Sequence, residues 1–356
     1  MGTEPVYICS GADRIAKVPE LHIEAILFNA PALLQGNAAA INASEVIATK
    51  NIAMTILDSG GKQIHEVNTG KSKRWLKFEP NSLNPLCIGK TLHLAPAHLS
   101  EAIKRLPGVA ICMALDDPVL PSKYPNICNK NFHEKIRRNT DFAIKTVEIR
   151  NANHPNVEIF LPMQCQTVLQ FEHYWEKLQS VGLDGISIPA RCFKKLEKLI
   201  PFVVRFRELN IQKVHILGTS NLNTIALLSF LARNGHFAHL AFDSTTWLAA
   251  ANHGLIVMPY SLKNIKISDE RHKEAIAALI EFDPIYSEYD LEDFHLLSNI
   301  EQTKHLRTLN YWAIMKTKRE IFANAGSAES LCTFLEAQDL HESDISNVHS
   351  LLNNMS

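Results

Sequence analysis

Residues 55–65 read TILDSGGKQIH, a short apolar run that stops on a carboxylate, a hydroxyl and two glycines. The run from Thr55 to Leu57 is typical of a buried strand. One explanation of its end is an ordinary strand-to-loop turn, in which Asp and Ser are frequent. The other is a ligand site, because Gly60 and Gly61 let the backbone approach a bound molecule closely beside the Asp58 carboxylate.

Similar runs recur along the first 260 residues, and stretches of helical character separate most of them. Alternating strands and helices indicate parallel pairing, and eight such strands predict a closed (β/α)8 TIM barrel. An open doubly wound sheet is the alternative, although no glycine-rich phosphate turn follows the first run. The eight predicted strands are Leu21–Phe28, Ala53–Asp58, Val109–Asp116, Val157–Gln164, Gly185–Pro189, Val214–Gly218, His236–Asp243 and Gly254–Pro259.

The character of the chain changes after Pro259, where helical patterns replace the alternation. Residues 268–281 predict a helix with Ser268 or Asp269 as its N-cap, and residues 290–323 predict one or two long helices. We therefore expect a catalytic barrel at residues 1–262 and a C-terminal helical region at residues 263–356 that packs on it.

Composition excludes some classes of protein. The formal net charge is −1, so any contact with nucleic acid has to come from local basic stretches. No apolar run approaches the roughly 18 residues of a membrane span, and the N-terminus has no signal-peptide pattern. The seven cysteines are scattered without a CxxC pair, so the sequence gives no support for a cysteine zinc site. An odd number of scattered cysteines suits a reducing cytoplasm.

Several predicted strands end on acids or amides. In a (β/α)8 barrel, chemistry sits at the C-terminal ends of the strands. Carboxylates that face one cavity raise one another's pKa, so that one can hold a proton while another stays ionised. The ordinary alternative is that these residues serve as turn residues and helix N-caps. The polar residues at these ends include Asp58, Asp116, Gln164 and Asp243.

Taken in order, the same segments resemble the signatures of the tRNA-guanine transglycosylase superfamily. LDSGGKQ (57–63) resembles its DSGGFQ motif, and LAFDSTTW (240–247) resembles the segment that carries its nucleophile. Further segments that resemble the family are MALDDPVLPSKYP (113–125), LDGISIP (183–189), VHILGTSN (214–221) and FHLLSN…KHLRTLNYW (294–312). The resemblance covers roughly residues 50–312 and implies a barrel enzyme that exchanges guanine in a nucleic acid for a 7-deazaguanine base.

By this resemblance Asp243 is the nucleophile, which holds a covalent glycosyl-enzyme, and Asp58 is the general acid/base. A carboxylate suits attack on an oxocarbenium-like carbon. Asp116 and Gln164 would bind the purine edge. Ser59, Gly60, Gly61 and Gly218 complete the expected substrate-binding set, and no cofactor is expected. Phe242 and Trp247 flank Asp243 and could wall the pocket or stack on a base, with core packing the expected role of Phe242.

Departures from the family pattern bear on the substrate. Lys62 replaces the Phe of the signature, and Pro189-Ala190 replaces a base-binding Gly-Gly. The segment that matches the family's zinc module, residues 282–290, contains no cysteine, so we predict that the zinc module is lost and that metal analysis finds no bound zinc. Because that module helps to seat tRNA in the family, its loss favours the branch that modifies DNA.

Basic stretches supply the candidate contacts to nucleic acid. A segment with basic residues around one aromatic ring suits phosphate neutralisation with stacking, although a solvated loop is the ordinary alternative. The expected contacts are Lys71, Lys73, Arg74, Trp75, Arg137 and Arg138. DNA is favoured over tRNA as the partner, a homo-oligomer or partner modification proteins are further candidates, and no membrane is expected. The alternative functions are a tRNA-acting enzyme and a non-catalytic partner subunit of such an enzyme.

Overall fold

The computed structural model describes most of the chain. Its described residues are 2–10, 23–34, 45, 47, 52–60, 87–88, 91–92, 94–106, 108–119, 130–190, 193, 196–289, 291, 293–338, 340–353 and 355.

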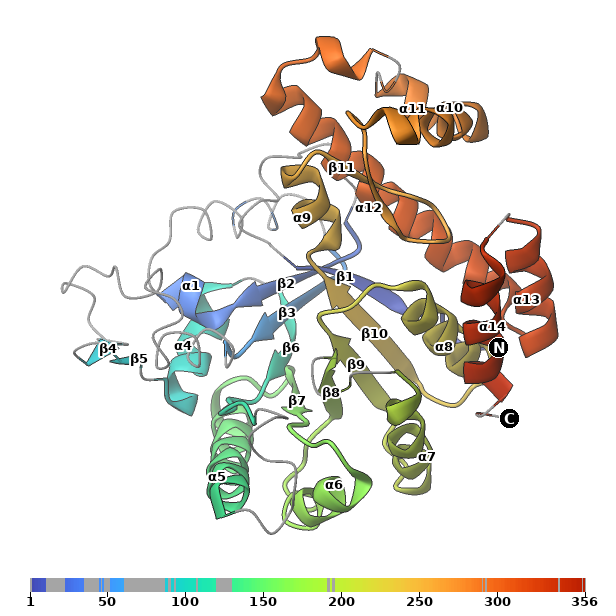
Figure 1. Ribbon diagram of the computed structural model, residues 1–356. Coiled ribbons are helices and arrows are strands. Elements are labelled where there is room, and N and C mark those ends of the chain that lie inside the picture. The colour runs from blue at the N-terminus through green and yellow to red at the C-terminus, as the bar shows by residue number, and fades with distance from the viewer. Residues whose placement is uncertain are drawn as a thin grey trace. The chain divides into compact units, whose positions relative to one another are not determined.

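Eight parallel strands form a closed barrel (Figure 1). Their order around the barrel is β1-β10-β9-β8-β7-β6-β3-β2. This architecture, with the helices that follow it, confirms the predicted (β/α)8 TIM barrel with C-terminal helices. The barrel strands are β1 (Val6–Ser10), β2 (Ala25–Asn29), β3 (Met54–Asp58), β6 (Val109–Met113), β7 (Glu158–Pro162), β8 (Gly185–Pro189), β9 (Lys213–Leu217) and β10 (His239–Ser244).

Two of the strand assignments differ from the sequence-based expectation. The prediction missed β1 (Val6–Ser10), although its five residues match the length of most other barrel strands. Gly254–Pro259 was wrongly predicted as a barrel strand. Its core is β11 (Leu255–Val257), which pairs antiparallel with β12 (Asn264–Lys266) in a separate two-stranded sheet. An apolar run of this length cannot reveal its partner, so the pattern alone did not separate the two cases.

The described residues form two compact units. We call residues 8–10 and 23–217 the N-terminal unit and residues 2–7 and 218–355 the C-terminal unit. The boundary predicted between residues 262 and 263 stays a prediction.

The strand register in the N-terminal unit explains the glycine at position 185. Phe160 pairs with Met113 on one side and with Gly185 on the other. A Cβ on Gly185 would lie only 2.8 Å from the Phe160 ring. The Phe160 ring therefore occupies the space that a side chain at position 185 would need, which explains a glycine at the start of β8.

Helices alternate with the strands of the N-terminal unit. Phe171 on α6 stacks edge-on against Phe206 on α7, with ring centroids 5.1 Å apart, and both are fully buried. Pro201 lies in the first turn of α7, where its missing N–H costs no helical hydrogen bond. The helices are α1 (Ala30–Leu34), α4 (Pro96–Arg105), α5 (Lys130–Asn153), α6 (Val168–Trp175), the 3-10 helix η4 (Leu196–Leu199) and α7 (Ile200–Glu208); a short hairpin of β4 (Cys87–Ile88) and β5 (Thr91–Leu92) precedes α4.

The C-terminal unit is built on one long helix, α12 (Asn299–Asn324). Ser298 and Glu301 form a capping box at its start. The Asn310 side chain accepts a hydrogen bond from the Val257 N–H (2.7 Å) and donates one to the Leu255 carbonyl (3.1 Å), which fixes β11 against α12. Its other helices are α8 (Leu222–Arg233), α9 (Thr246–Asn252), η5 (Glu270–His272), α10 (Lys273–Phe282), α11 (Ile285–Glu288), η6 (Phe294–Leu296), α13 (Ala328–Glu336) and α14 (Glu342–Asn353).

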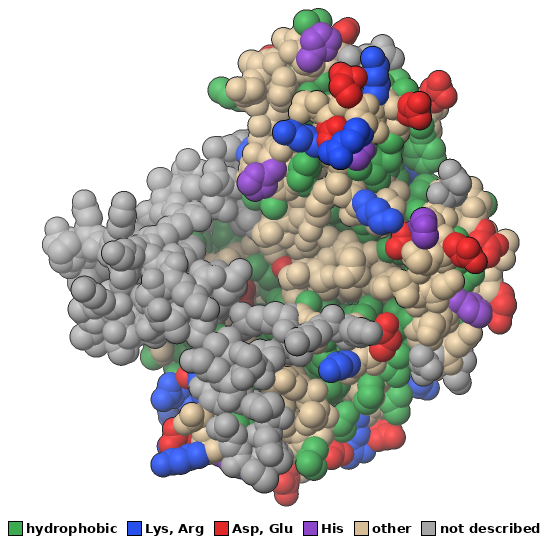
Figure 2. Space-filling view, viewed as in Figure 1, with side chains coloured by type: hydrophobic (Ala, Val, Ile, Leu, Met, Phe, Trp, Pro, Cys, Tyr) green, Lys and Arg blue, Asp and Glu red, His purple; other side chains and the backbone are tan. Residues whose placement is uncertain are grey.

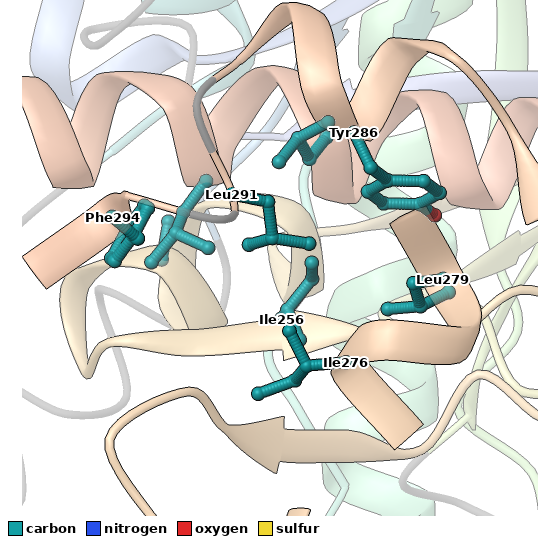
Figure 3. Close-up of a cluster of buried hydrophobic side chains, with 9 residues drawn as sticks. Ile256, Ile276, Leu279, Tyr286, Leu291 and Phe294 are labelled. Carbon is teal, nitrogen blue, oxygen red and sulfur yellow. The ribbon is translucent and has the colours of Figure 1, made fainter. Parts of the chain in front are cut away.

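An apolar cluster fills the part of this unit that includes residues 282–289. Figure 3 shows Tyr286 of α11 among aliphatic and aromatic side chains from β11, α10 and η6. Tyr286 also meets Trp312 of α12 edge-on, with ring centroids 5.5 Å apart. Within the described residues, no group of three or more His, Cys, Asp or Glu side chains could hold a metal ion. The apolar contacts of Tyr286 bury this segment against its neighbours.

No described helix has the length and apolar character needed to cross a membrane.

Candidate functional site

The strand end that carries Asp58 lies in the N-terminal unit. Asp58 is the last residue of β3 and pairs in register with Asn29, the last residue of β2. Gly60 has a φ of +81°, a conformation that side-chain-bearing residues rarely adopt. Gly60 therefore makes the turn after Ser59, as the sequence pattern suggested, whereas Gly61 and Lys62 lie outside the described residues.

The charge of the Asp58 carboxylate also affects the pKa of a thiol on β6. Burial, and secondarily the negative charge of Asp58, raises the pKa of the Cys112 thiol. Cys112 is therefore a protonated core thiol at neutral pH and not a nucleophile.

Asp116 is the centre of a buried hydrogen-bond network. The Ser59 hydroxyl donates to its Oδ1 (2.9 Å), and the Gln164 amide donates to its Oδ2 (2.5 Å). Oε1 of Gln164 accepts a hydrogen bond from the Val119 N–H (3.3 Å), which fixes the amide with its Nε2 toward Asp116. All three side chains are buried. The sequence predicted each of them as substrate-binding, and the structure brings the three together.

This network orients the Asp116 carboxylate. Each of its oxygens accepts a hydrogen bond from a neutral donor. Asp116 in turn acts on its surroundings, since burial, followed by the charges of Cys165 and Asp116, raises the pKa of Tyr174 on α6. A buried carboxylate of this kind is suited to accept hydrogen bonds from the N–H groups of a purine edge.

In the C-terminal unit, Gly218 and Asp243 form a second polar group. Asp243 is buried near the end of β10. The backbone N–H of Gly218 donates to Oδ1 of Asp243 (3.1 Å), and Gly218 has a φ of +80°. Gly218 was predicted to bind substrate. The structure gives its N–H a defined role in orienting the Asp243 carboxylate.

The aromatic residues beside Asp243 belong to the core. Phe242 is fully buried and lies 5.2 Å from the Tyr7 ring. Trp247 is 1% exposed and packs edge-on against Tyr311. This burial agrees with the core role expected for Phe242, and it argues against Trp247 stacking on a base.

The predicted contacts to nucleic acid fall in two groups. Lys71, Lys73, Arg74 and Trp75 lie outside the described residues. Arg137 and Arg138 are exposed on α5, and Arg138 makes an ion pair with Asp117 (2.8 Å). Figure 2 shows basic and acidic side chains interspersed over the described part of the face in view. The contacts to nucleic acid stay predictions.

Two asparagines near these strand ends were not predicted. Asn29 ends β2 beside Asp58, and Asn139 of α5 contacts the residue that follows Asp116. A polar residue at the end of the first predicted strand was a usable signal for Asn29. Asn139 lies inside a helix and its partner is 22 residues away, so no local pattern could have identified it.

The comparisons with known proteins leave the family open, because no model of a known protein family matches the chain and no curated protein matches its sequence.

Proposed function

We propose that the protein is a nucleic-acid guanine transglycosylase that exchanges guanine in DNA for a 7-deazaguanine base. The observation that carries the proposal is the buried Ser59–Asp116–Gln164 network. It offers a buried carboxylate, held in place by neutral donors, at the end of parallel barrel strands where enzymes of this fold bind substrates. The order of motifs that resemble the transglycosylases supports the same activity.

In the proposed reaction, Asp243 attacks C1′ of the target deoxyguanosine as the C1′–N9 bond breaks. A bond forms between the Asp243 carboxylate and C1′, and Asp58 as general acid supplies the proton that neutralises the departing guanine. N9 of the incoming 7-deazaguanine then gives its proton to Asp58 and attacks C1′, which releases Asp243. The Gly218 N–H on Oδ1 supports this role because it fixes the orientation of the carboxylate.

Asp116 is assigned to base recognition. Guanine presents the N1–H and the 2-amino group on one edge, and an ionised carboxylate can accept from both. A 7-deazaguanine has the same edge, so one residue would serve the leaving and the entering base. Burial of Asp116 supports discrimination, since a base that lacks these donors would cover the carboxylate without supplying the hydrogen bonds that its remaining lone pairs can accept.

The choice of DNA rests on residues 282–290, where the family's zinc ligands are missing. A target base in a duplex must first be flipped out of the stack, at a cost of a few kcal/mol. The exposed Arg137 and the basic stretch at residues 71–77 are the candidates for holding the flanking phosphates.

The test is incorporation of a radiolabelled 7-cyano-7-deazaguanine by the full chain into duplex DNA and, separately, into tRNA. Wild type is expected to label DNA and Asp243→Ala is expected to label neither polymer. Labelling of tRNA alone would replace DNA by tRNA as the substrate. Equal labelling by wild type and Asp243→Ala would overturn the nucleophile, and no labelling by wild type would favour a non-catalytic partner subunit.

A further inference from the structure

The segment after Asp116 is held by the side chain of one buried residue of α5. Oδ1 of Asn139 accepts a hydrogen bond from the Asp117 N–H (2.7 Å), and its Nδ2 donates to the Asp117 carbonyl (3.1 Å). Asn139 has no exposed surface. A single amide thus satisfies both backbone groups of Asp117, much as a neighbouring strand would.

Charged side chains of the same helix add to this attachment. Lys135 donates to Oδ1 of Asp117 and to the Pro118 carbonyl (3.0 Å), and Arg138 donates to Oδ2 of Asp117 (2.8 Å). Lys135 is mostly buried, whereas more than half of the Arg138 side chain is exposed. We expect the Lys135 contacts to contribute more, because exposed ion pairs are worth little.

The attachment encloses the base-recognition network. Asp116 precedes the clamped residue, and Val119, two residues after it, donates to the Gln164 amide that meets Asp116. The backbone from residue 116 to residue 119 is therefore fixed from α5 on one side and from Gln164 on the other. A shift of Asp117 would move both the Asp116 carboxylate and the donor that orients Gln164.

We propose that Asn139 is a positioning residue for base recognition, assisted by Lys135: it sets the place of the Asp116 carboxylate. The inference rests on the proposed function, because it assigns Asn139 a part in binding the base. Position 139 requires an amide, because the side chain must both accept from the Asp117 N–H and donate to the Asp117 carbonyl. An ionised Asp can only accept, and an Ala can neither accept nor donate.

The experiment uses the full chain and the variants Asn139→Ala, Asn139→Asp and Lys135→Gln. Asn153→Ala is the matched control, because Asn153 lies on the same helix and donates only to the exposed turn at Ile149. Binding of guanine and of 7-cyano-7-deazaguanine is measured by calorimetry. Hydrogen exchange of the peptide that spans residues 114–119 is followed without ligand, and thermal melting reports folding.

Asn139→Ala is expected to weaken base binding by about 10- to 100-fold and to speed exchange in residues 114–119, because two buried hydrogen bonds are lost. In the exchange reaction, KM for the incoming base rises while kcat stays within about threefold. Lys135→Gln keeps a polar side chain at this position, so it is expected to fold, and it is expected to weaken binding by about three- to tenfold. Asn153→Ala behaves as wild type.

Unchanged base affinity in Lys135→Gln and in any Asn139 variant that folds overturns the inference, as does a fall in kcat at constant KM. If wild type and Asn153→Ala bind neither base, the proposed function fails, and the base-binding role of Asn139 fails with it. If wild type binds the base and Asp116→Asn does not, while the Asn139 and Lys135 variants bind normally, only the inference fails.

Discussion

At the scale of single residues, the molecule places neutral hydrogen-bond donors around buried carboxylates. The Ser59 hydroxyl and the Gln164 amide meet Asp116, and a backbone N–H meets Asp243. Neutral donors stabilise a charged acceptor without introducing a second charge that would need a partner of its own. These hydrogen bonds orient the two carboxylates, which both proposed roles require.

Replacing Gln164 by Glu tests this arrangement. A carboxyl group next to Asp116 forces the two groups to share a proton, so the pKa of one of them is raised in the folded protein. The stability that this proton provides is present in acid and is lost as the pH rises through the raised pKa. The loss in melting temperature of Gln164→Glu relative to wild type is therefore expected to be larger at about pH 8 than at about pH 5.

Gln179→Glu is the control. Gln179 is exposed on the same unit, and its substitution adds the same charge as Gln164→Glu. Its melting temperature relative to wild type should vary little over this range. A deficit for Gln164→Glu that is independent of pH would argue against a shared proton with Asp116.

Gly218 combines a left-handed backbone conformation with a hydrogen bond to the proposed nucleophile, Asp243. No atom outside its immediate neighbours lies within 4 Å of a Cβ built on Gly218, so the Gly218→Ala side chain itself fits. The cost is the φ of +80°, about 1 kcal/mol or more for a side-chain-bearing residue. We expect a modest loss of stability in urea denaturation, and a larger fall in exchange activity because the N–H leaves Asp243. A stability loss with full activity would remove Gly218 from the account.

At the scale of elements, the last turn of α5 ties neighbouring loops to the start of β7. Arg150 donates to Oδ2 of Asp184 (2.9 Å), to the Val157 carbonyl (3.1 Å) and to the Gly182 carbonyl (2.8 Å). Asp184 also accepts a hydrogen bond from the Ile159 N–H (2.8 Å). This network and the Asn139 contacts hold α5 at two points, one in its last turn and one nearer its middle.

Asp184→Ala removes the acceptor that joins Arg150 to β7. Loss of a partly buried, charge-assisted network is expected to cost about 1–3 kcal/mol of unfolding free energy. Lys145→Ala is the matched control on the same helix. It removes an exposed ion pair with Glu148 and should change stability by less than about 0.5 kcal/mol. Equal losses in the two variants, measured by urea denaturation, would mean that the Arg150 network carries no special weight.

The elements also show what the sequence could reveal. Near-continuous apolar runs such as Val109–Met113 and Gly185–Pro189 predicted buried parallel strands correctly, because strands covered on both faces have no polar alternation. The same signal overlooked Val6–Ser10 and included Leu255–Val257, since a short run does not encode its hydrogen-bonding partner.

The candidate site divides in the same way. Asp58, Asp116 and Asp243 could be chosen as candidates because each stands at the end of a predicted strand. The pairing of Ser59 and Gln164 with Asp116, and the bonds from Asn139, depend on three-dimensional contacts across 22 to 57 residues of chain. Sequence position alone does not carry such information.

At the scale of the whole molecule, the net charge of −1 gives no general attraction to a polyanion. Affinity for DNA must then come from a few local phosphate contacts, each of which releases counterions. The triple variant Lys71→Gln, Lys73→Gln and Arg74→Gln is expected to reduce the slope of log K against log salt by about 3 units. Arg138→Gln should change it less, because its guanidinium already pairs with Asp117. An unchanged slope in the triple variant would place the DNA elsewhere on the protein.

The covalent intermediate tests the central claim most directly. Full-length protein is incubated with guanine-containing duplex DNA, denatured, and separated by electrophoresis, and the adduct is located by mass spectrometry after proteolysis. The account predicts a protein–DNA adduct on Asp243 in the wild type, its loss on addition of excess base, and no adduct in Asp243→Asn. An adduct of equal yield in Asp243→Asn, or one mapped to another residue, would contradict it.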